Sequence, residues 1–213
     1  MSAPARQRLH VDERKSQLLD LAIALFGDRS YEEISIDEFA KRGGISKGLL
    51  YHYFPSKRAL YVAAVKHAAE RLLEETKVEP TSDAETARPG PHDALRQGLA
   101  AYLRYVEEHA AAYAFLLRSG VGSDDEVAAI VEETRSRFAS RVGEGIGLDE
   151  GDAEGKLLIR GWIGFVEATS LAWAEERSIS RERLLEITAG AFLLGYQLTS
   201  GAHPLRKSTA TGI

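Results

Sequence analysis

The sequence predicts an all-α protein of about nine helices, in which an N-terminal helix-turn-helix domain of three helices precedes a larger helical domain. Three observations support this fold class. Apolar residues recur with helical period in every long segment, and no segment shows the alternation of a strand. Serine–glutamate pairs spaced as in capping boxes stand ahead of apolar runs. Glycines follow the runs where helices should end.

The N-terminal end is expected to be an arm followed by a helix. Residues 1–10 carry Arg6 and Arg8, and such arms reach DNA phosphates or the minor groove. A disordered terminus is an equally good interpretation of the same residues. From residue 12 to residue 27, apolar residues recur at helical spacing, which predicts the first helix.

A helix-turn-helix follows, and it is the most informative feature of the chain. Ser35 and Glu38 fit a capping box, so a short helix should begin there and end at the glycine pair 43–44. Ser46 can cap a second short helix directly after the turn. Because two short helices with a glycine-containing turn seat the second helix in a DNA major groove, this segment indicates nucleic acid as a partner.

Six further helices are expected beyond the turn. Ser56 should cap a fourth helix that ends near residue 76, and a linker rich in proline and polar residues occupies 77–92. A second capping box, Ser123 with Glu126, should open a later helix. After the linker the expected helices span residues 93–109, 110–118, 123–142, 152–176 and 181–200.

Little in the sequence supports an enzyme. Gly143, Gly145 and Gly147 resemble half of a dinucleotide fingerprint, but that motif follows a strand and here a helix precedes it, so a helix stop is favoured. None of the six histidines stands at metal-ligand spacing from another histidine or an acid, so neither a metal site nor a cofactor is expected. Adjacent acidic pairs do not face each other on a helix and make poor acid–base dyads.

Composition favours a soluble globular protein of the cytoplasm. The chain of 213 residues is 44% hydrophobic and 28% charged and has no cysteine, which excludes disulfides and thiolate zinc sites. No apolar run approaches the roughly 18 residues of a membrane span, and the N-terminus lacks the apolar core of a signal peptide. Residues 1–60 hold ten basic and eight acidic side chains, against 17 and 24 in the remainder. The net charge of −5 therefore arises outside the helix-turn-helix segment.

The sequence LYHYFPSK at 50–57, followed by Ala59 and Leu60, resembles the end of the recognition helix and the start of the fourth helix in tetracycline-repressor-type (TetR-family) regulators. Residues upstream match the family's first helix and its exit: Leu18, Ala22, Leu25, Phe26, Gly27 and Tyr31. The resemblance implies an all-helical homodimer. Its residues 11–71 would bind a near-palindromic operator DNA, and its residues 72–213 would bind a small-molecule effector and dimerise.

The helix-turn-helix and the resemblance together indicate the DNA-binding residues. The early residues of a recognition helix meet base edges, where Lys47 can donate to guanine or to a phosphate and Gly48 allows close approach. Lys57 matches the family's phosphate-binding lysine. The expected DNA-binding residues are Ser35, Ser46, Lys47, Gly48, Leu49, Tyr51, His52 and Lys57. DNA contact is favoured over core packing for Tyr51, whereas both remain open for Tyr53.

The last two expected helices combine small residues with aromatic ones, which suits a four-helix bundle formed by two subunits. A core within one chain would use the same residues. The expected dimer-interface residues are Gly161, Gly164, Ala168, Ala172, Phe192 and Gly195. The expected effector pocket, suited to an apolar or aromatic molecule, contains Tyr102, Tyr105, Phe115, Arg118, Phe138, Trp162 and Phe165.

These expectations describe a TetR-like regulator, a repressor released from its operator by an effector. The alternative is a helical small-molecule-binding or interaction protein that lacks specific DNA binding. The presence of Lys47, Tyr51 and Lys57 together favours the regulator.

Overall fold

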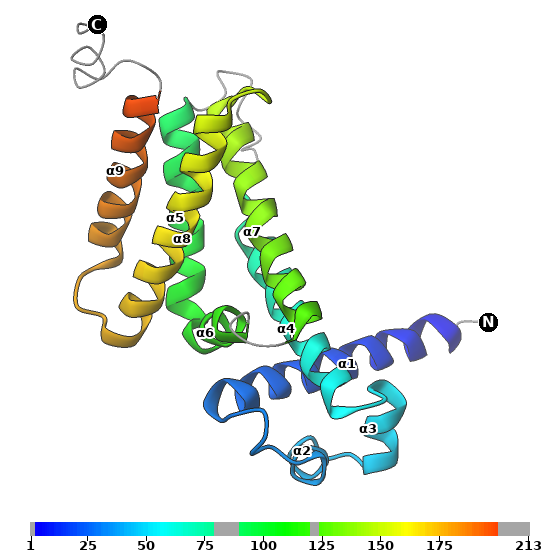
Figure 1. The fold of residues 1–213 in the computed structure, drawn as a ribbon. Helices are drawn as coiled ribbons and strands as arrows, with labels where there is room; N and C mark the ends of the chain where they lie inside the picture. The colour runs from blue at the N-terminus through cyan, green and yellow to red at the C-terminus, as the bar shows by residue number, and fades with distance from the viewer. Residues whose placement is uncertain (1–2, 79–89, 120–123, 200–213) are drawn as a thin grey trace, which may run out of the picture. The chain divides into compact units, whose positions relative to one another are not determined.

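The computed structural model describes residues 3–78, 90–119 and 124–199, and the side chains from residue 12 onward. Over these residues the chain forms nine α-helices and no strand, which confirms the predicted fold class (Figure 1). The helices are α1 (Ala3–Asp28), α2 (Ile36–Arg42), α3 (Lys47–Tyr53), α4 (Lys57–Glu75), α5 (Pro91–Glu108), α6 (Ala110–Ser119), α7 (Asp125–Ile146), α8 (Ala153–Glu176) and α9 (Arg181–Thr199). In the same ranges, no helix is both long and apolar enough to cross a lipid bilayer.

The helices group into two compact units. Unit 1 comprises Met1–Arg71 and Ala111–Val131, and unit 2 comprises Leu72–Ala110 and Glu132–Ile213. The predicted division into 11–71 and 72–213 places its boundary at the same point of α4. It does not anticipate that residues 111–131 join the N-terminal unit.

The described residues of the segment 111–131 contact α4, which belongs mainly to unit 1. The Phe115 ring meets the Tyr61 ring edge-on with centroids 5.7 Å apart, and the Tyr61 hydroxyl hydrogen-bonds the Ser119 hydroxyl at 2.9 Å. Arg58 Nε donates to the Asp124 carboxylate at 2.8 Å. Such contacts join elements far apart in sequence, which helical periodicity does not report.

Two helix starts differ from the prediction. Helix α1 begins at Ala3 instead of residue 12, so the expected arm is helical from that point. Alanine, arginine, glutamine and leucine are strong helix formers, and Pro4 stands in the first turn, where proline is tolerated. Helix α7 begins at Asp125, and the Asp124 carboxylate accepts the backbone N–H of Val127 at 3.3 Å. The predicted cap Ser123 lies outside the described residues, as does most of the predicted linker at 77–92.

Of the three glycines near the end of α7, only Gly147 follows the helix, so the predicted helix stop is confirmed at that residue alone. Helix α7 continues through Gly143 and Gly145 and ends at Ile146. Gly147 then adopts a φ of 68°, a backbone conformation that favours glycine. No strand precedes this segment in the described ranges, so the dinucleotide interpretation has no structural basis.

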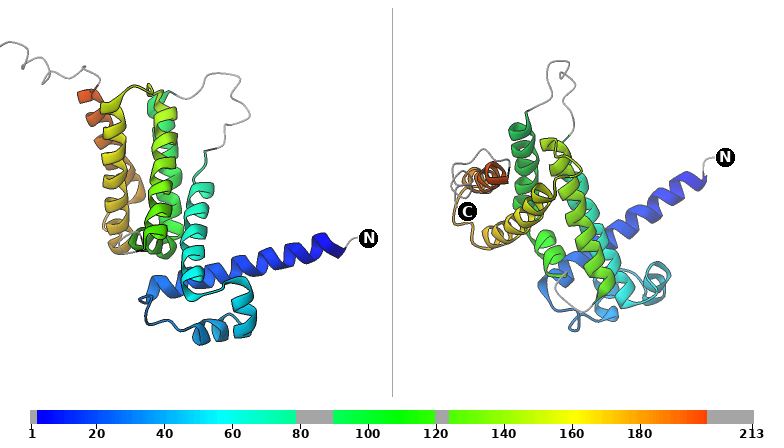
Figure 2. Two further views of the ribbon diagram at one scale, coloured as in Figure 1. Left: turned by 45° about the vertical axis from the view of Figure 1, so that its right-hand side comes forward. Right: turned by 45° about the horizontal axis from the view of Figure 1, so that its top comes forward.

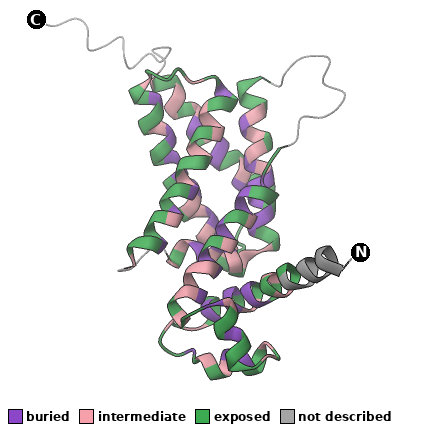
Figure 3. Ribbon diagram, turned by 90° about the vertical axis from the view of Figure 1, so that its right-hand side faces the viewer, coloured by how far each residue is buried: buried purple, intermediate pink, exposed green. Residues whose placement is uncertain are grey.

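In unit 2, α5, α8 and α9 run alongside one another (Figure 2). Each helix buries one side against its neighbours and exposes the other (Figure 3). Leu103, Val106 and Phe192 are among the fully buried side chains of this unit. Burial of such side chains contributes about 1.5–3 kcal/mol each, which is how the unit acquires a core.

Candidate DNA-binding and effector sites

The turn between α2 and α3 has a defined geometry. Gly44 adopts a φ of 61°, which favours glycine. Its N–H donates to the Lys41 carbonyl at 3.2 Å, and the next N–H, of Ile45, donates to the Ala40 carbonyl at 3.1 Å. Arg14, on α1, donates to the Gly43 carbonyl at 2.9 Å and so ties the turn to the first helix. The turn is therefore held by backbone hydrogen bonds to α2 and by a side-chain hydrogen bond from α1.

The predicted caps of the short helices are present. The Ser35 hydroxyl accepts the Glu38 N–H, and the Ser46 hydroxyl accepts the Leu49 N–H, each at 3.1 Å. Such caps stabilise a helix by about 0.5–2 kcal/mol. That is a large contribution for helices of seven residues, which are marginal alone in water.

Helix α3 turns one side into the core and presents the other to solvent. Leu50 is fully buried, which fixes the rotation of the helix about its axis. The residues predicted to meet DNA lie on the outer side: Ser46, Lys47, Gly48, Leu49, Tyr51 and His52 are all exposed. Leu49 is 41% exposed and Tyr51 42% exposed, although both are large hydrophobic side chains. Tyr53 is intermediate, so both interpretations of this residue stay open.

Lys47 does not stand alone on this surface. Its ammonium lies 2.9 Å from one carboxylate oxygen of Asp37 and 3.1 Å from the other. Both side chains are exposed, so burial does not force the ammonium and the carboxylate together. The hydrogen bond to the Asp37 carboxylate raises the pKa of Lys47. Asp37 was not among the predicted site residues, because basic and neutral polar side chains are the ones expected to contact DNA phosphates and bases.

Lys57, at the first turn of α4, lies over an aromatic ring. Its ammonium is 4.3 Å from the centroid of the Tyr31 ring, within cation–π distance. Burial raises the pKa of Tyr31 despite the nearby Arg58 guanidinium, so the phenol is neutral at physiological pH. The negative face of the ring attracts the ammonium and holds it at the first turn of α4. The assignment of Lys57 to a DNA phosphate remains a prediction.

The predicted effector-pocket residues do not all come together. Tyr102 and Phe138 pack edge-on at 5.4 Å in unit 2, where Tyr105 is also buried. Phe115 and Arg118 belong to unit 1 instead, because α6 packs there.

Trp162 is also part of the unit 2 interior. Its indole N–H donates to the Thr188 carbonyl at 2.8 Å, and its ring lies 5.0 Å from that of Phe192. Trp162 and Phe192 therefore pack against each other inside unit 2.

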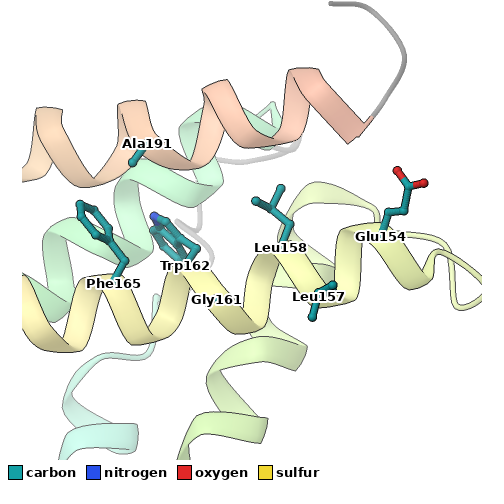
Figure 4. A pocket seen from close by; sticks show the side chains of 7 residues that line it. All are labelled: Glu154, Leu157, Leu158, Gly161, Trp162, Phe165 and Ala191. Carbon is teal, nitrogen blue, oxygen red and sulfur yellow. The ribbon is translucent and has the colours of Figure 1, made fainter. Parts of the chain in front are cut away.

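Phe165 lies instead at a surface hollow of about 440 Å³ on α8 and α9 (Figure 4). The hollow is lined by Glu154, Leu157, Leu158, Gly161, Trp162, Phe165 and Ala191. Figure 4 shows Leu158, Trp162 and Phe165 extending from α8 toward α9. Because Gly161 was predicted for the dimer interface and Phe165 for the effector pocket, the two predicted sets overlap at this hollow.

Helices α8 and α9 each expose an apolar stripe. On α8 it follows 3–4 spacing and consists of Leu157, Gly161, Gly164, Phe165, Ala168 and Ala172, all exposed. On α9 it consists of Ile187, Ala191, Leu194 and Leu198, also exposed. Leu157 is 74% exposed and Leu194 62% exposed, which is unusual for leucine in a helix with its own core.

Two predicted interface residues on α9 lie elsewhere. Phe192 is 1% exposed and packs on Trp162, so its side chain belongs to the core of its own chain. A Cβ added at Gly195 would lie 2.5 Å from Leu158 Cδ1, so this glycine faces α8 of the same chain. The exposed stripes also contain Leu157, Ile187, Leu194 and Leu198, which the prediction did not include although their helical spacing was present in the sequence.

In the parts of the chain that the structure describes, no group of three or more histidine, aspartate or glutamate side chains could hold a metal ion. The charged side chains of unit 2 form surface and half-buried ion pairs, such as Arg135 with Glu167 at 3.0 Å.

Two family models match the chain. Residues 18–64 match the model described as bacterial regulatory proteins, tetR family, and residues 91–195 match the model described as tetracyclin repressor-like, C-terminal domain. The first range contains α2, α3 and the start of α4. The second contains α5 to α8 and most of α9.

Solved structures and curated relatives agree with these matches. A tetR-family transcriptional regulator from Streptomyces coelicolor is 32% identical, with a TM-score of 0.74 over 92% of this chain and 86% of that one. The HTH-type transcriptional activator FasR of Mycolicibacterium smegmatis is 31% identical over 68% of this chain and 64% of its own length. The HTH-type transcriptional regulator EthR of the same species is 29% identical over 47% of this chain and 44% of its own. The chain thus spans less than two thirds of the curated relatives it matches. All three proteins are named as regulators, not enzymes.

Proposed function

We propose, on the premise that this chain belongs to the TetR family of bacterial transcriptional regulators, that it binds a near-palindromic operator DNA as a homodimer and represses transcription until a small-molecule effector releases it. Regulators of this family bind operator DNA and form dimers. The observation that carries the proposal for this chain is the exposed side of α3. Buried Leu50 fixes the helix while Lys47, Leu49 and Tyr51 extend outward.

The outer side of α3 suits a major groove. Lys47 has donors for guanine O6/N7 or phosphate, and Gly48 leaves room for close approach of the backbone. A Cβ added at Gly48 would meet nothing nearer than the Ser46 hydroxyl at 4.0 Å, so close packing within the chain does not require this glycine. We infer that Ser35, Tyr51, His52 and Lys57 contribute phosphate or base contacts around this centre.

The apolar stripes of α8 and α9 support the homodimer. Exposed leucines on two adjacent helices are covered when a second copy presents the same stripes across a twofold axis. Small residues in the α8 stripe, Gly161, Gly164, Ala168 and Ala172, let the helices of a four-helix bundle approach closely. In this arrangement the hollow that contains Phe165 is covered by the partner subunit and is not the effector site.

The interior of unit 2 supports an apolar or aromatic effector. Buried Tyr102 and half-buried Phe138 form an aromatic pair in this unit, and the Ser170 hydroxyl of α8 is buried without a hydrogen-bond partner in the described residues. A buried hydroxyl normally has a partner, so an effector that brings one polar group to Ser170 would gain a hydrogen bond. The effector acts by binding the DNA-incompetent state more tightly. Coupling of about 1–3 kcal/mol weakens operator binding about 5–150-fold, and DNA weakens effector binding by the same factor.

Selection from random-sequence DNA with the purified full chain tests the DNA-binding part. A near-palindromic consensus is expected, bound at least about 10³-fold more tightly than scrambled DNA at moderate salt. A small-molecule-binding or interaction protein without specific DNA binding would enrich no consensus, and that result would overturn the proposal.

A reporter promoter that overlaps the selected site tests the direction of regulation. Expression should fall when the protein is produced, because a bound dimer occupies the promoter. A rise in expression would identify an activator and contradict repression while leaving the DNA-binding part intact. Titration of apolar effectors against free and operator-bound protein tests release. Equal affinity for the two forms would exclude the release mechanism.

A further inference from the structure

The exposed side of α3 and the adjacent first turn of α2 form the proposed recognition surface. This surface carries an acidic side chain, whereas DNA-binding surfaces usually carry basic side chains. Asp37, in the first turn of α2, is exposed and holds the Lys47 ammonium at 2.9 Å. A carboxylate on a surface that faces phosphates lowers non-specific affinity, because that affinity comes from neutralising phosphate charge. Asp37 therefore opposes the sequence-independent part of binding.

The ion pair alters what Lys47 can do on DNA. A lysine ammonium has three N–H donors, and Asp37 uses part of that capacity. The charge of Lys47 is balanced locally by the carboxylate, so its attraction to a phosphate is reduced. Its remaining donors can still reach guanine O6 and N7, which are paired acceptors in the major groove.

The carboxylate has acceptor capacity of its own. An ionised aspartate has about four lone-pair sites, more than one lysine uses. In the major groove, cytosine N4 is the donor that aspartate and glutamate accept from. A lysine and an aspartate held side by side thus present donors for guanine and acceptors for cytosine, the two bases of one G·C pair.

We propose that Asp37 is a specificity-determining residue that acts with Lys47: the pair reads one G·C base pair in each half-site, and Asp37 keeps Lys47 from phosphates. This inference rests on the proposed DNA-binding function. It predicts a G·C pair of fixed orientation in each half of the selected consensus. In the wild-type protein, changing that pair to A·T should weaken binding about 5–150-fold per half-site.

Asp37→Asn is the central variant, measured on the selected site, on its A·T variant and on scrambled DNA at several salt concentrations. The penalty for A·T should shrink to less than about twofold. Affinity for scrambled DNA should rise, and the salt slope should steepen by about one unit per half-site, because Lys47 then neutralises a phosphate. Glu32→Gln is the matched control, since Glu32 is exposed in the same unit and the removed charge is equal. It should leave the A·T penalty unchanged.

Two further variants separate this role from a structural one. In a Lys47→Met background, Asp37→Asn should change the A·T penalty no further, since the residues act as a pair. Asp37→Glu keeps the charge and should retain the G·C preference even if Asp37→Asn were too unstable to measure. Replacement of the guanine by 7-deazaguanine removes N7 and should weaken the wild type but not Lys47→Met, whose side chain has no donor.

An Asp37→Asn protein that keeps both the A·T penalty and the salt slope of the wild type would overturn the inference. The same conclusion would follow if Asp37→Asn changed the penalty equally with and without Lys47. If the wild type selects no consensus at all, the proposed function itself fails, and the inference fails with it. The two failures are therefore distinguishable from one set of measurements.

Discussion

Gly161 and Gly164 should tolerate leucine within one subunit and not within the dimer. Apart from its chain neighbours and the backbone of its own helix, a Cβ at either position would meet no atom of the described residues within 4 Å, so the protomer has room for a larger side chain. Leucine also has a higher helix propensity than glycine, by about 0.5–1 kcal/mol. The isolated protomer should thus be as stable as the wild type or slightly more so.

In the proposed dimer, the same substitutions to leucine should be destabilising. In a closely packed bundle, an added side chain costs about 1–3 kcal/mol through overpacking. A twofold axis uses each position twice, so the total is about 2–6 kcal/mol. This corresponds to dimer dissociation about 30-fold to 10⁴-fold easier than in the wild type.

Sedimentation velocity over a range of concentrations measures this change, and circular dichroism confirms that the helices persist. Gly98→Leu on α5 is the control, because a Cβ there also meets no atom within 4 Å but the glycine lies outside the stripes. In Gly164→Leu, loss of the dimer should also abolish operator binding, although unit 1 is unchanged. A Gly164→Leu protein that dimerises as tightly as the wild type would show that α8 is not at the interface.

Three other variants test separate parts of the structure. Gly155→Ala should lower the free energy of unfolding by about 1–3 kcal/mol, measured by urea, because its Cβ would lie 2.4 Å from a leucine carbon and 2.6 Å from the N-capping carboxylate of α8. Unchanged stability would mean that both neighbours move freely. Arg58→Gln should raise the pKa of Asp124 toward the ordinary 3.8, because the guanidinium hydrogen bonds hold it lower. A carboxyl with a lowered pKa in the folded state adds stability that is present above its ordinary pKa and lost as the pH falls through the folded-state pKa. Arg58→Gln should therefore lose this pH dependence of stability below pH about 4. An Asp124 carboxyl titration that NMR finds unchanged in the variant would refute this reasoning. Lys57→Ala should weaken binding to operator and scrambled DNA by one common factor and flatten the salt slope by about one unit per half-site; a loss confined to the operator would assign Lys57 to a base.

The sequence by itself was sufficient for the fold class, the short helices and their caps. Ser35, Ser46 and Ser56 cap their helices as expected, because capping depends on a serine and the N–H groups within the next turn. The outward position of Tyr51 followed from its spacing relative to buried Leu50. These features are local, and a few consecutive residues contain the forces that produce them.

Tertiary structure decided the features that depend on partners distant in the chain. It placed Phe115 in unit 1 beside Tyr61, and it buried Phe192 against Trp162. An aromatic residue at helical spacing has the same local pattern whether it lies in a core, a pocket or an interface, so periodicity alone could not separate these roles.

The pairing of Asp37 with Lys47 also needed the three-dimensional structure. The two residues stand on different helices, which the turn at Gly44 joins, and their side chains lie within hydrogen-bond distance. The sequence contains the charges and the turn. Their distance is set by how α2 packs on α3, because side-chain contacts between helices depend on crossing geometry and core packing, not on order in the chain.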